Sequence, residues 1–317
     1  QTSTHQQVVG KITFAPDNQE TEIFKNESIL ACSLRAGIPH YHACGGKGKC
    51  STCRVFVEHG LHNCSQRNAL ESAMAQHLGF PPHLRLACQT KNVHGEVVLK
   101  RPVLDHIDLK IIMSANSRDF SKSIGQEQNV AVVFTDMVGF TSFSAGIPYY
   151  DVAHLLNRYF HQMGEVVFEH HGQIIDYYGD GFLSVFRGNK KGCCPALIAT
   201  KAALAMQETM FQLNKYFMLL YGKIVRIRCG IAYGQAILGW LGAHKAEKYA
   251  VVGEVVNTAS RIEQYNKKLG THLLVSDTVF EKIKDYAITG KVEKGVSLRG
   301  LDKDYTLYEV LKLKDLK

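Results

Sequence analysis

The sequence predicts an α+β protein with two domains, the second built around a largely antiparallel sheet. The 317 residues, of which 45% are apolar, are enough for two hydrophobic cores. Helical and strand-like stretches alternate in the second part of the chain, but hairpins lie among them, which favours antiparallel pairing. Six of the nine cysteines lie within the first 88 residues, and this odd total with tight local clustering argues against a secreted disulfide framework and for a metal site in a reducing compartment.

Composition and charge exclude several functions. The formal net charge of +8 is spread along the chain without a basic tail, so we expect no nucleic-acid partner. No run approaches the roughly 18 apolar residues of a membrane span, and no signal peptide is visible. We therefore expect a cytoplasmic protein with no membrane segment in this chain. Because the chain begins at Gln1 rather than Met, the cytoplasmic part of a longer membrane-anchored chain is the alternative.

The N-terminal domain is expected to begin with a hairpin over 8–14 and 21–24 and a helix over 27–37. A glycine-rich loop with C-x5-C-x2-C spacing follows, and a fourth cysteine lies further on: Cys44, Cys50, Cys53 and Cys88. Three glycines in the loop let the backbone aim its N–H groups inward, as around an iron–sulfur cluster. Zinc or free thiols are the alternatives, although structural zinc usually uses two close cysteine pairs.

With this loop and the segment RLACQ (85–89), residues 8–102 resemble a [2Fe–2S] ferredoxin domain with a β-grasp fold. The resemblance implies that the four cysteines of the motif are the cluster ligands, in a loop similar to that of adrenodoxin. Cys32 and Cys64 fall outside the pattern, and Cys32 is expected in the core. We therefore divide the chain into a ferredoxin domain (1–102), a linker (103–129) that is either a tether or a coupling segment, and a second domain (130–317).

The second domain opens with a strand that ends in an acid. Residues 130–144 form an apolar run up to Asp136, then Gly139 and the expected start of a helix. A carboxylate for a cation beside free N–H groups for an anion suits a metal-bound polyphosphate, and a helix-capping Asp explains the stretch equally well. Asp180 lies in the Gly-Asp-Gly turn of a hairpin predicted over 172–186. On neighbouring strand ends, the two carboxylates can bridge two divalent cations.

Later elements are expected from hydrophobic spacing. Residues 223–243 read as two strands joined near Gly234. Asn257, Ser260 and Arg261 share one helical face, away from the apolar face, either as solvated surface or as ligand-binding groups. The other predicted elements are helices over 149–171, 193–213 and 253–270, and strands over 272–275, 295–299 and 305–313.

Four motifs in order, FTDMVGFTSFS, YYGDGFLSVF, VGEVVNTASRIE and LRGLDKDYTLYEV, make residues 128–315 resemble the catalytic domain of class III nucleotidyl cyclases. The resemblance implies a ferredoxin-like α/β fold with a mainly antiparallel sheet. It implies cyclisation of a nucleoside triphosphate to the 3′,5′-cyclic monophosphate with loss of pyrophosphate. It also implies a head-to-tail homodimer, in which each composite site takes its metal pair from one subunit and its Asn and Arg from the other.

The resemblance assigns roles to particular residues. Two Mg²⁺ or Mn²⁺ ions would be held by Asp136, Asp180 and the Met137 carbonyl. Asn257 would orient the ribose, and Arg261 would steady the α-phosphate. The triphosphate would lie against the following residues, of which the last replaces a lysine of the family: Gly139, Phe140, Thr141 and Arg299.

The residues expected to meet the base depart from the family pattern. Adenylyl members place Lys at the position of Asp176 and Asp or Thr at that of Ala250, whereas guanylyl members place Glu and Cys there. Asp176 thus resembles the guanylyl residue in chemistry, and Ala250 resembles its partner in size. ATP cyclisation is, however, the commonest activity of such domains in microbial chains. We expect ATP as substrate, with GTP as the alternative.

The leading hypothesis is therefore a nucleotidyl cyclase regulated by the redox state of its cluster, served by a redox partner. A constitutive cyclase with a purely structural cluster is a second hypothesis. A third is an electron-transfer ferredoxin whose second domain only dimerises or binds nucleotide, and the intact Asp136, Asp180, Asn257 and Arg261 argue against it.

Overall fold

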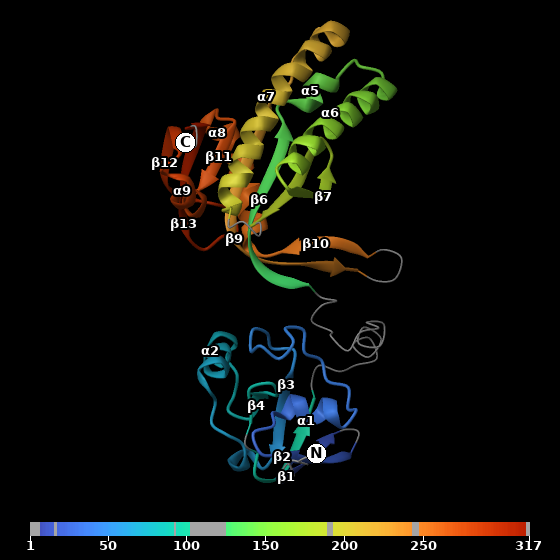
Figure 1. Ribbon diagram of the computed structural model, residues 1–317, viewed down its shortest axis with the longest axis vertical. Coiled ribbons are helices and arrows are strands. Elements are labelled where there is room, and N and C mark those ends of the chain that lie inside the picture. Colours follow the sequence, from blue (N-terminus) through green and yellow to red (C-terminus); the bar gives the residue numbers. More distant parts are fainter. Residues whose placement is uncertain are drawn as a thin grey trace, which may run out of the picture. The chain divides into compact units, whose positions relative to one another are not determined.

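A computed structural model describes residues 7–15, 18–91, 93–101, 125–188, 193–242 and 247–314. The chain divides into two compact units, Gln1–Gly125 and Gln126–Lys317, each with its own sheet and hydrophobic core (Figure 1). Most of the predicted linker, 103–129, lies outside the described residues, and its end from Gln126 onward belongs to a strand of the second unit. None of the helices in the described ranges has both the length and the hydropathy that a membrane crossing requires.

The N-terminal unit has the predicted β-grasp fold. Its five strands lie in the order β2-β1-β5-β3-β4, and β1 pairs with β5 in parallel while the other neighbours are antiparallel. The predicted hairpin and helix are confirmed, and the Ser28 hydroxyl caps α1 by accepting from the Ala31 N–H. The elements are β1 (Val8–Ala15), β2 (Gln19–Phe24), α1 (Ile29–Arg35), β3 (Arg54–His59), a 3₁₀ turn (Leu61–Asn63), α2 (Ala69–Leu78), β4 (Leu84–Leu86) and β5 (Gly95–Lys100).

The core of this unit lies between the sheet and α1. Phe14 on β1 and Leu99 on β5 are fully buried there, and so is Cys32 on α1, as its apolar position predicted. Cys64 is partly buried at the edge of the same core. Neither of these two cysteines belongs to the predicted ligand set.

The second unit is a larger sheet with helices on both faces. Its strands lie in the order β12-β13-β11-β9-β6-β8-β7, with β10 added to β9. The pairing is antiparallel except between β9 and β11, which confirms the predicted fold class. The elements are β6 (Gln126–Met137), α5 (Phe140–Ser144), α6 (Tyr149–Glu169), β7 (Gly172–Tyr178), β8 (Gly181–Arg187), α7 (Pro195–Tyr221), β9 (Ile227–Leu241), β10 (Lys248–Val252), α8 (Glu254–Leu269), β11 (Leu273–Ser276), α9 (Asp277–Ile283), β12 (Ala287–Ser297) and β13 (Asp304–Leu313).

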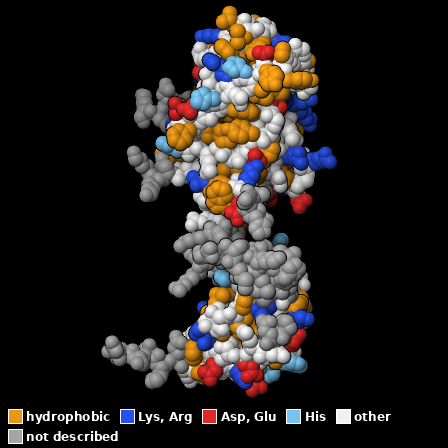
Figure 2. Space-filling view, turned by 90° about the vertical axis from the view of Figure 1, so that its right-hand side faces the viewer, with side chains coloured by type: hydrophobic (Ala, Val, Ile, Leu, Met, Phe, Trp, Pro, Cys, Tyr) orange, Lys and Arg blue, Asp and Glu red, His pale blue; other side chains and the backbone are white. Residues whose placement is uncertain are grey.

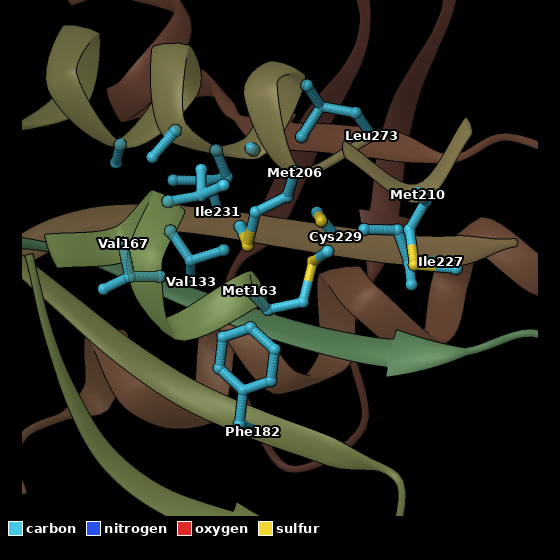
Figure 3. Close-up of a cluster of buried hydrophobic side chains, with 14 of the residues drawn as sticks. Val133, Met163, Val167, Phe182, Met206, Met210, Ile227, Cys229, Ile231 and Leu273 are labelled. Atoms are coloured by element: carbon cyan, nitrogen blue, oxygen red, sulfur yellow. The ribbon is translucent and has the colours of Figure 1, made fainter. Parts of the chain in front are cut away.

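Alternation along β6 gives the sheet two buried faces. Val133 packs beneath α6 and α7, against Met163 and Met206 (Figure 3). Val132, one residue earlier, points to the opposite face and joins the cluster that includes Ala259 of α8. The central strand is therefore buried on both sides, and its polar residues are confined to its ends.

The prediction of two strands joined near Gly234 is wrong. Residues 227–241 form one continuous strand, β9, because it pairs with β6 from Gln126↔Leu238 to Met137↔Ile227 without a break. Gly234 lies opposite Val130 in this ladder. A Cβ built on Gly234 would lie 3.5 Å from Val255 of α8, which is an ordinary contact, so this position lies under α8 within a continuous strand and not at a turn.

Candidate functional site

The structure brings the two predicted metal carboxylates to one place. Asp136 lies near the end of β6, and Asp180 lies in the turn between β7 and β8. Because Thr135 pairs with Phe182, the end of β6 lies beside that turn. A Cβ on Gly181 would lie 2.7 Å from the Thr135 carbonyl oxygen and 3.1 Å from Asp136 Oδ1, so a larger residue would push the turn away from the end of β6. The sequence motif is thus realised as two neighbouring acids at the ends of adjacent strands.

The electrostatics of this pair suit a cation. Burial raises the pKa of Asp136, and the charge of Asp180 raises it further. Burial likewise raises the pKa of Asp180. The Met137 N–H donates to both carboxylates and Arg228 lies near, and both effects oppose the shift without removing it. A divalent cation would relieve this repulsion, so the residues present fit the predicted Mg²⁺ or Mn²⁺ site.

A third carboxylate beneath the pair was not predicted. Glu263 on α8 is 7% exposed, and burial together with the charge of Asp136 raises its pKa to about 7. It can lie there because α8 touches β9 at Gly230, where a Cβ would overlap the backbone nitrogen of Glu263. A glycine inside a strand indicates such a close approach, but the sequence does not say which segment approaches.

The predicted phosphate-binding loop follows directly after the metal carboxylate. Gly139 has φ +70° and precedes α5, whose Thr141 is exposed. Lys223 holds this short helix in place, because its Nζ donates to the Phe143 carbonyl at 2.7 Å. Arg299 lies on an exposed turn after β12, and the structure records no contact between it and these residues within the described chain.

Asn257 and Arg261 do not meet the metal carboxylates of their own chain. Both lie outside the face of α8 that packs on the sheet. Within the described residues, the recorded side-chain partner of Arg261 is Gln264, at 3.1 Å, and none is recorded for Asn257. A single chain therefore brings together the metal carboxylates and the phosphate-binding loop, but not Asn257 and Arg261.

The predicted base-recognition residues lie together, with a lysine that was not predicted. Asp176 on β7 forms an ion pair with Lys248 on β10, and also accepts hydrogen bonds from the side chain of Tyr178 and the backbone of Tyr177. The hydrogen bond from Lys248 lowers the pKa of Asp176. Ala250 is two residues from Lys248, on the same face of β10. The strand pattern KYAVV contains this lysine, but β10 pairs with β9, and its approach to β7 depends on the fold.

In the first unit, the four predicted cysteines form two thiol pairs. Cys44 accepts a hydrogen bond from Cys50, which lowers the pKa of Cys44 to about 5. Cys88 likewise accepts from Cys53, and this bond lowers the pKa of Cys88 to about 7. No three His, Cys, Asp or Glu side chains in the described ranges converge closely enough to hold one metal ion. Two pairs of thiols fit a two-iron cluster, with two ligands for each iron.

The loop around these thiols provides hydrogen-bond donors. The Cys44 sulfur accepts from the backbone of Lys47 and Lys49, and the Cys88 sulfur from that of Gly48. The Thr52 hydroxyl accepts from the Ala43 N–H at 2.9 Å and lies 3.1 Å from the Cys50 sulfur, so it can donate its own proton to that sulfur when Cys50 is a thiolate. Gly48 can aim its N–H inward because its φ is +69°. These donors suit thiolates that carry the charge of a cluster.

Comparison with known proteins agrees with this geometry. Residues 123–312 match the sequence family of the adenylate and guanylate cyclase catalytic domain, and residues 12–92 match the 2Fe-2S iron-sulfur cluster binding domain. The chain belongs to the class III nucleotidyl cyclase family, and its N-terminal unit is a [2Fe–2S] domain. Adenylate cyclase 1 of Rhizobium meliloti is 34% identical over 169 residues, 53% of this chain but 25% of that protein. The alignment thus spans about a quarter of the relative's length.

Solved structures show the same fold in the second unit. A guanylyl cyclase is 28% identical, with a TM-score of 0.56 over 60% of this chain and 95% of that one. The adenylyl cyclase CyaB from P. aeruginosa is 26% identical, with a TM-score of 0.53 over 59% of this chain and 95% of that one. Relatives with both base specificities therefore share the fold, and similarity alone does not choose the base.

Proposed function

We propose that this protein converts a nucleoside triphosphate, preferentially ATP, into the 3′,5′-cyclic monophosphate and pyrophosphate. The observation that carries the proposal is the pair Asp136 and Asp180, two half-buried carboxylates that share the Met137 N–H. Bound by them, two divalent cations would lower the pKa of the ribose 3′-hydroxyl and neutralise the charge of the pyrophosphate. The Met137 carbonyl would be a further ligand.

The other residues of the chain hold the substrate. The loop Gly139–Thr141 offers backbone N–H groups to the triphosphate, and Arg299 adds a positive charge. Asn257 orients the ribose. Arg261 donates to the α-phosphate as charge develops, an effect on the order of 10³ to 10⁵ in rate for arginines in phosphoryl transfer. These assignments follow the family motif.

The direct test is incubation of the whole protein with ATP or GTP in the presence of Mg²⁺ or Mn²⁺, followed by identification of the product. A 3′,5′-cyclic monophosphate with equimolar pyrophosphate is expected. Absence of any cyclic product with either nucleotide and either metal would favour the electron-transfer hypothesis, in which the second unit only binds nucleotide or dimerises.

The pair Asp176 and Lys248 supports ATP. A lone carboxylate would face the N1 lone pair of adenine, which is unfavourable. Lys248 beside it can donate to N1 while Asp176 accepts from the 6-amino group, so the pair matches the adenine edge. GTP is the runner-up, because Asp176 can also accept from guanine N1–H.

Replacing Asp176 by Lys is expected to lower kcat/KM for ATP at least tenfold, because two cations would then face the adenine edge and its amino group would lose its acceptor. The measurement is kcat/KM for both nucleotides in the wild type, Asp176→Lys and Lys248→Met. Lys248→Met should lose discrimination through the missing N1 donor. Unchanged nucleotide preference in both variants would remove this pair from base recognition.

We propose a head-to-tail homodimer, because Asn257 and Arg261 do not meet the metal carboxylates of their own chain. The second unit also exposes large apolar side chains on its strands, among them Tyr177, Tyr178 and Trp240, each at least half exposed. Figure 2 shows apolar side chains recurring across one face of this unit. Such surface is suited to a second copy of the chain.

A mixture of Asp136→Asn and Arg261→Ala proteins is expected to recover about a quarter of the wild-type rate, although each is inactive alone. Half of the random dimers are mixed, and each mixed dimer has one intact composite site. The control is a mixture of Asp136→Asn and Asp180→Asn, which damages the metal half in every subunit and should stay inactive. Recovery in the control, or none in the first mixture, contradicts the composite site.

We further propose that the cluster regulates the cyclase, with 103–129 as the coupling segment and a redox partner as the electron source. The support is the presence of both domains in one chain. Rates measured with the cluster oxidised and dithionite-reduced test this directly. Equal rates would leave a structural cluster and a constitutive cyclase.

A further inference from the structure

We infer that Gln89 sets the reduction potential of the cluster by donating a hydrogen bond to the Cys88 sulfur, and that Asn68 at the start of α2 positions Gln89. The inference rests on the [2Fe–2S] domain, not on the cyclase activity. Gln89 Nε2 lies 3.3 Å from Cys88 Sγ and 3.3 Å from the Gly46 carbonyl oxygen. Its side chain thus reaches a predicted ligand from outside the cysteine loop.

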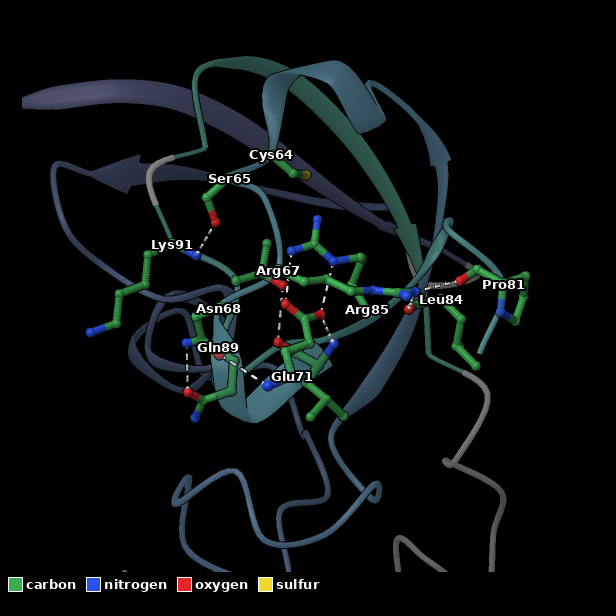
Figure 4. A network of polar contacts seen from close by, with 12 residues as sticks. Cys64, Ser65, Arg67, Asn68, Glu71, Pro81, Leu84, Arg85, Gln89 and Lys91 are labelled. Carbon is green, nitrogen blue, oxygen red and sulfur yellow. Dashed lines mark hydrogen bonds and ion pairs between the residues drawn. The ribbon is translucent and has the colours of Figure 1, made fainter. Parts of the chain in front are cut away.

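The orientation of the Gln89 amide follows from its neighbours. Asn68 Oδ1 caps α2 by accepting from the Glu71 N–H at 2.9 Å, so the Asn68 amide nitrogen must face the other way. That nitrogen donates to Gln89 Oε1 at 3.0 Å (Figure 4). The remaining Nε2 of Gln89 then faces Gly46 O, which can only accept. Two backbone groups thus fix which end of the amide points to sulfur.

A buried ion pair holds this frame in place. Arg85 is 3% exposed and Glu71 is fully buried, and Arg85 donates to both carboxylate oxygens of Glu71 at 2.8 Å (Figure 4). Glu71 also accepts from the Leu86 N–H at 2.8 Å. Since Leu86 ends β4 just before Cys88, the ion pair ties the N-terminal part of α2 to the strand that delivers this ligand.

The cysteine loop leaves room for the amide at one glycine. A Cβ on Gly48 would lie 3.1 Å from Gln89 Nε2, so the glycine that aims its own N–H at Cys88 also admits the second donor. Cys88 is 6% exposed, so water competes little for its sulfur. A donor to a buried thiolate stabilises the more negative, reduced cluster and thereby raises the reduction potential.

The test is a redox titration of the whole protein. It is monitored through the visible absorption of the cluster and the electron spin resonance signal of its reduced form. Gln89→Leu, which removes the donor, is expected to shift the midpoint potential to a more negative value. Gln89→Glu should shift it further, because a carboxylate replaces the amide near the sulfur. Ser65→Ala is the matched control, since the Ser65 hydroxyl accepts from the Lys91 N–H and has no recorded hydrogen bond to a predicted ligand cysteine in the described residues.

Asn68→Asp separates positioning from helix capping. An aspartate still caps α2 but cannot donate to Gln89, so the Gln89 amide turns its oxygen toward Cys88 and the potential falls. The inference is overturned if Gln89→Leu and Asn68→Asp both have the same midpoint potential as Ser65→Ala while their iron and sulfide content is unchanged. Should Gln89→Leu fail to hold its cluster, Asn68→Asp alone decides, because its capping oxygen is retained.

Discussion

Replacing Asp180 by asparagine is expected to lower the rate of cyclic nucleotide formation on the order of 10³-fold. The amide keeps the size of the side chain but removes its charge. That charge, together with the charge of Asp136, makes this end of the strands attractive to divalent cations. The measurement is kcat for ATP and GTP at saturating Mg²⁺ and again at saturating Mn²⁺.

Two controls show whether the loss of rate comes from the metal carboxylate itself. The visible spectrum of the cluster should be unchanged, because Asp180 belongs to the other unit. Asp302→Asn, at an exposed turn between β12 and β13, should retain the wild-type rate. A loss smaller than tenfold in Asp180→Asn would show that this carboxylate is not needed to hold the metals.

Replacing Gly230 by alanine is expected to destabilise the second unit by about 3 kcal/mol and to abolish most activity. The added methyl group would lie 2.5 Å from the Ala259 carbonyl and overlap the Glu263 backbone nitrogen. Backbone cannot rotate aside as a side chain can, so α8 must move away from β9. That helix carries Asn257 and Arg261.

Gly164→Ala provides the matched comparison. Gly164 lies within α6, and a Cβ there would meet only Ile174 Cδ1 at 3.6 Å, an ordinary contact. This variant should be as stable as the wild type or up to about 1 kcal/mol more stable, because alanine favours helix. Thermal melts with and without Mg²⁺ distinguish the two variants by the melting temperature of the second unit. Equal melting temperatures would show that α8 does not contact β9 as closely as described.

The motifs with local chemistry were predicted from the sequence. The strand ending at Asp136, the hairpin turn at Asp180 and the cysteine loop each follow from spacing that short-range physics enforces. Gly37 and Gly270 are the last residues of the helices predicted over 27–37 and 253–270; they follow α1 and α8, and both have positive φ. These features need no knowledge of the rest of the fold.

The features that were missed depend on contacts between distant segments. Gly234 resembles a turn residue, yet pairing with β6 keeps β9 extended through it. Glu263 looks like a solvated helix residue until Gly230 admits α8 to the sheet. Lys248 becomes the partner of Asp176 only when β10 and β7 come together. In each case a tertiary contact decides what a local pattern leaves open.

The acids at the end of β6 also link metal loading to proton exchange. With the pKa of Glu263 near 7 and those of Asp136 and Asp180 raised, these carboxyl groups of the metal-free protein lose their protons at a higher pH than ordinary carboxyl groups do. A cation that settles beside them must expel those protons. Its apparent affinity is therefore expected to rise with pH and to fall on acidification, so a change in pH acts on the second unit as a change in metal supply does.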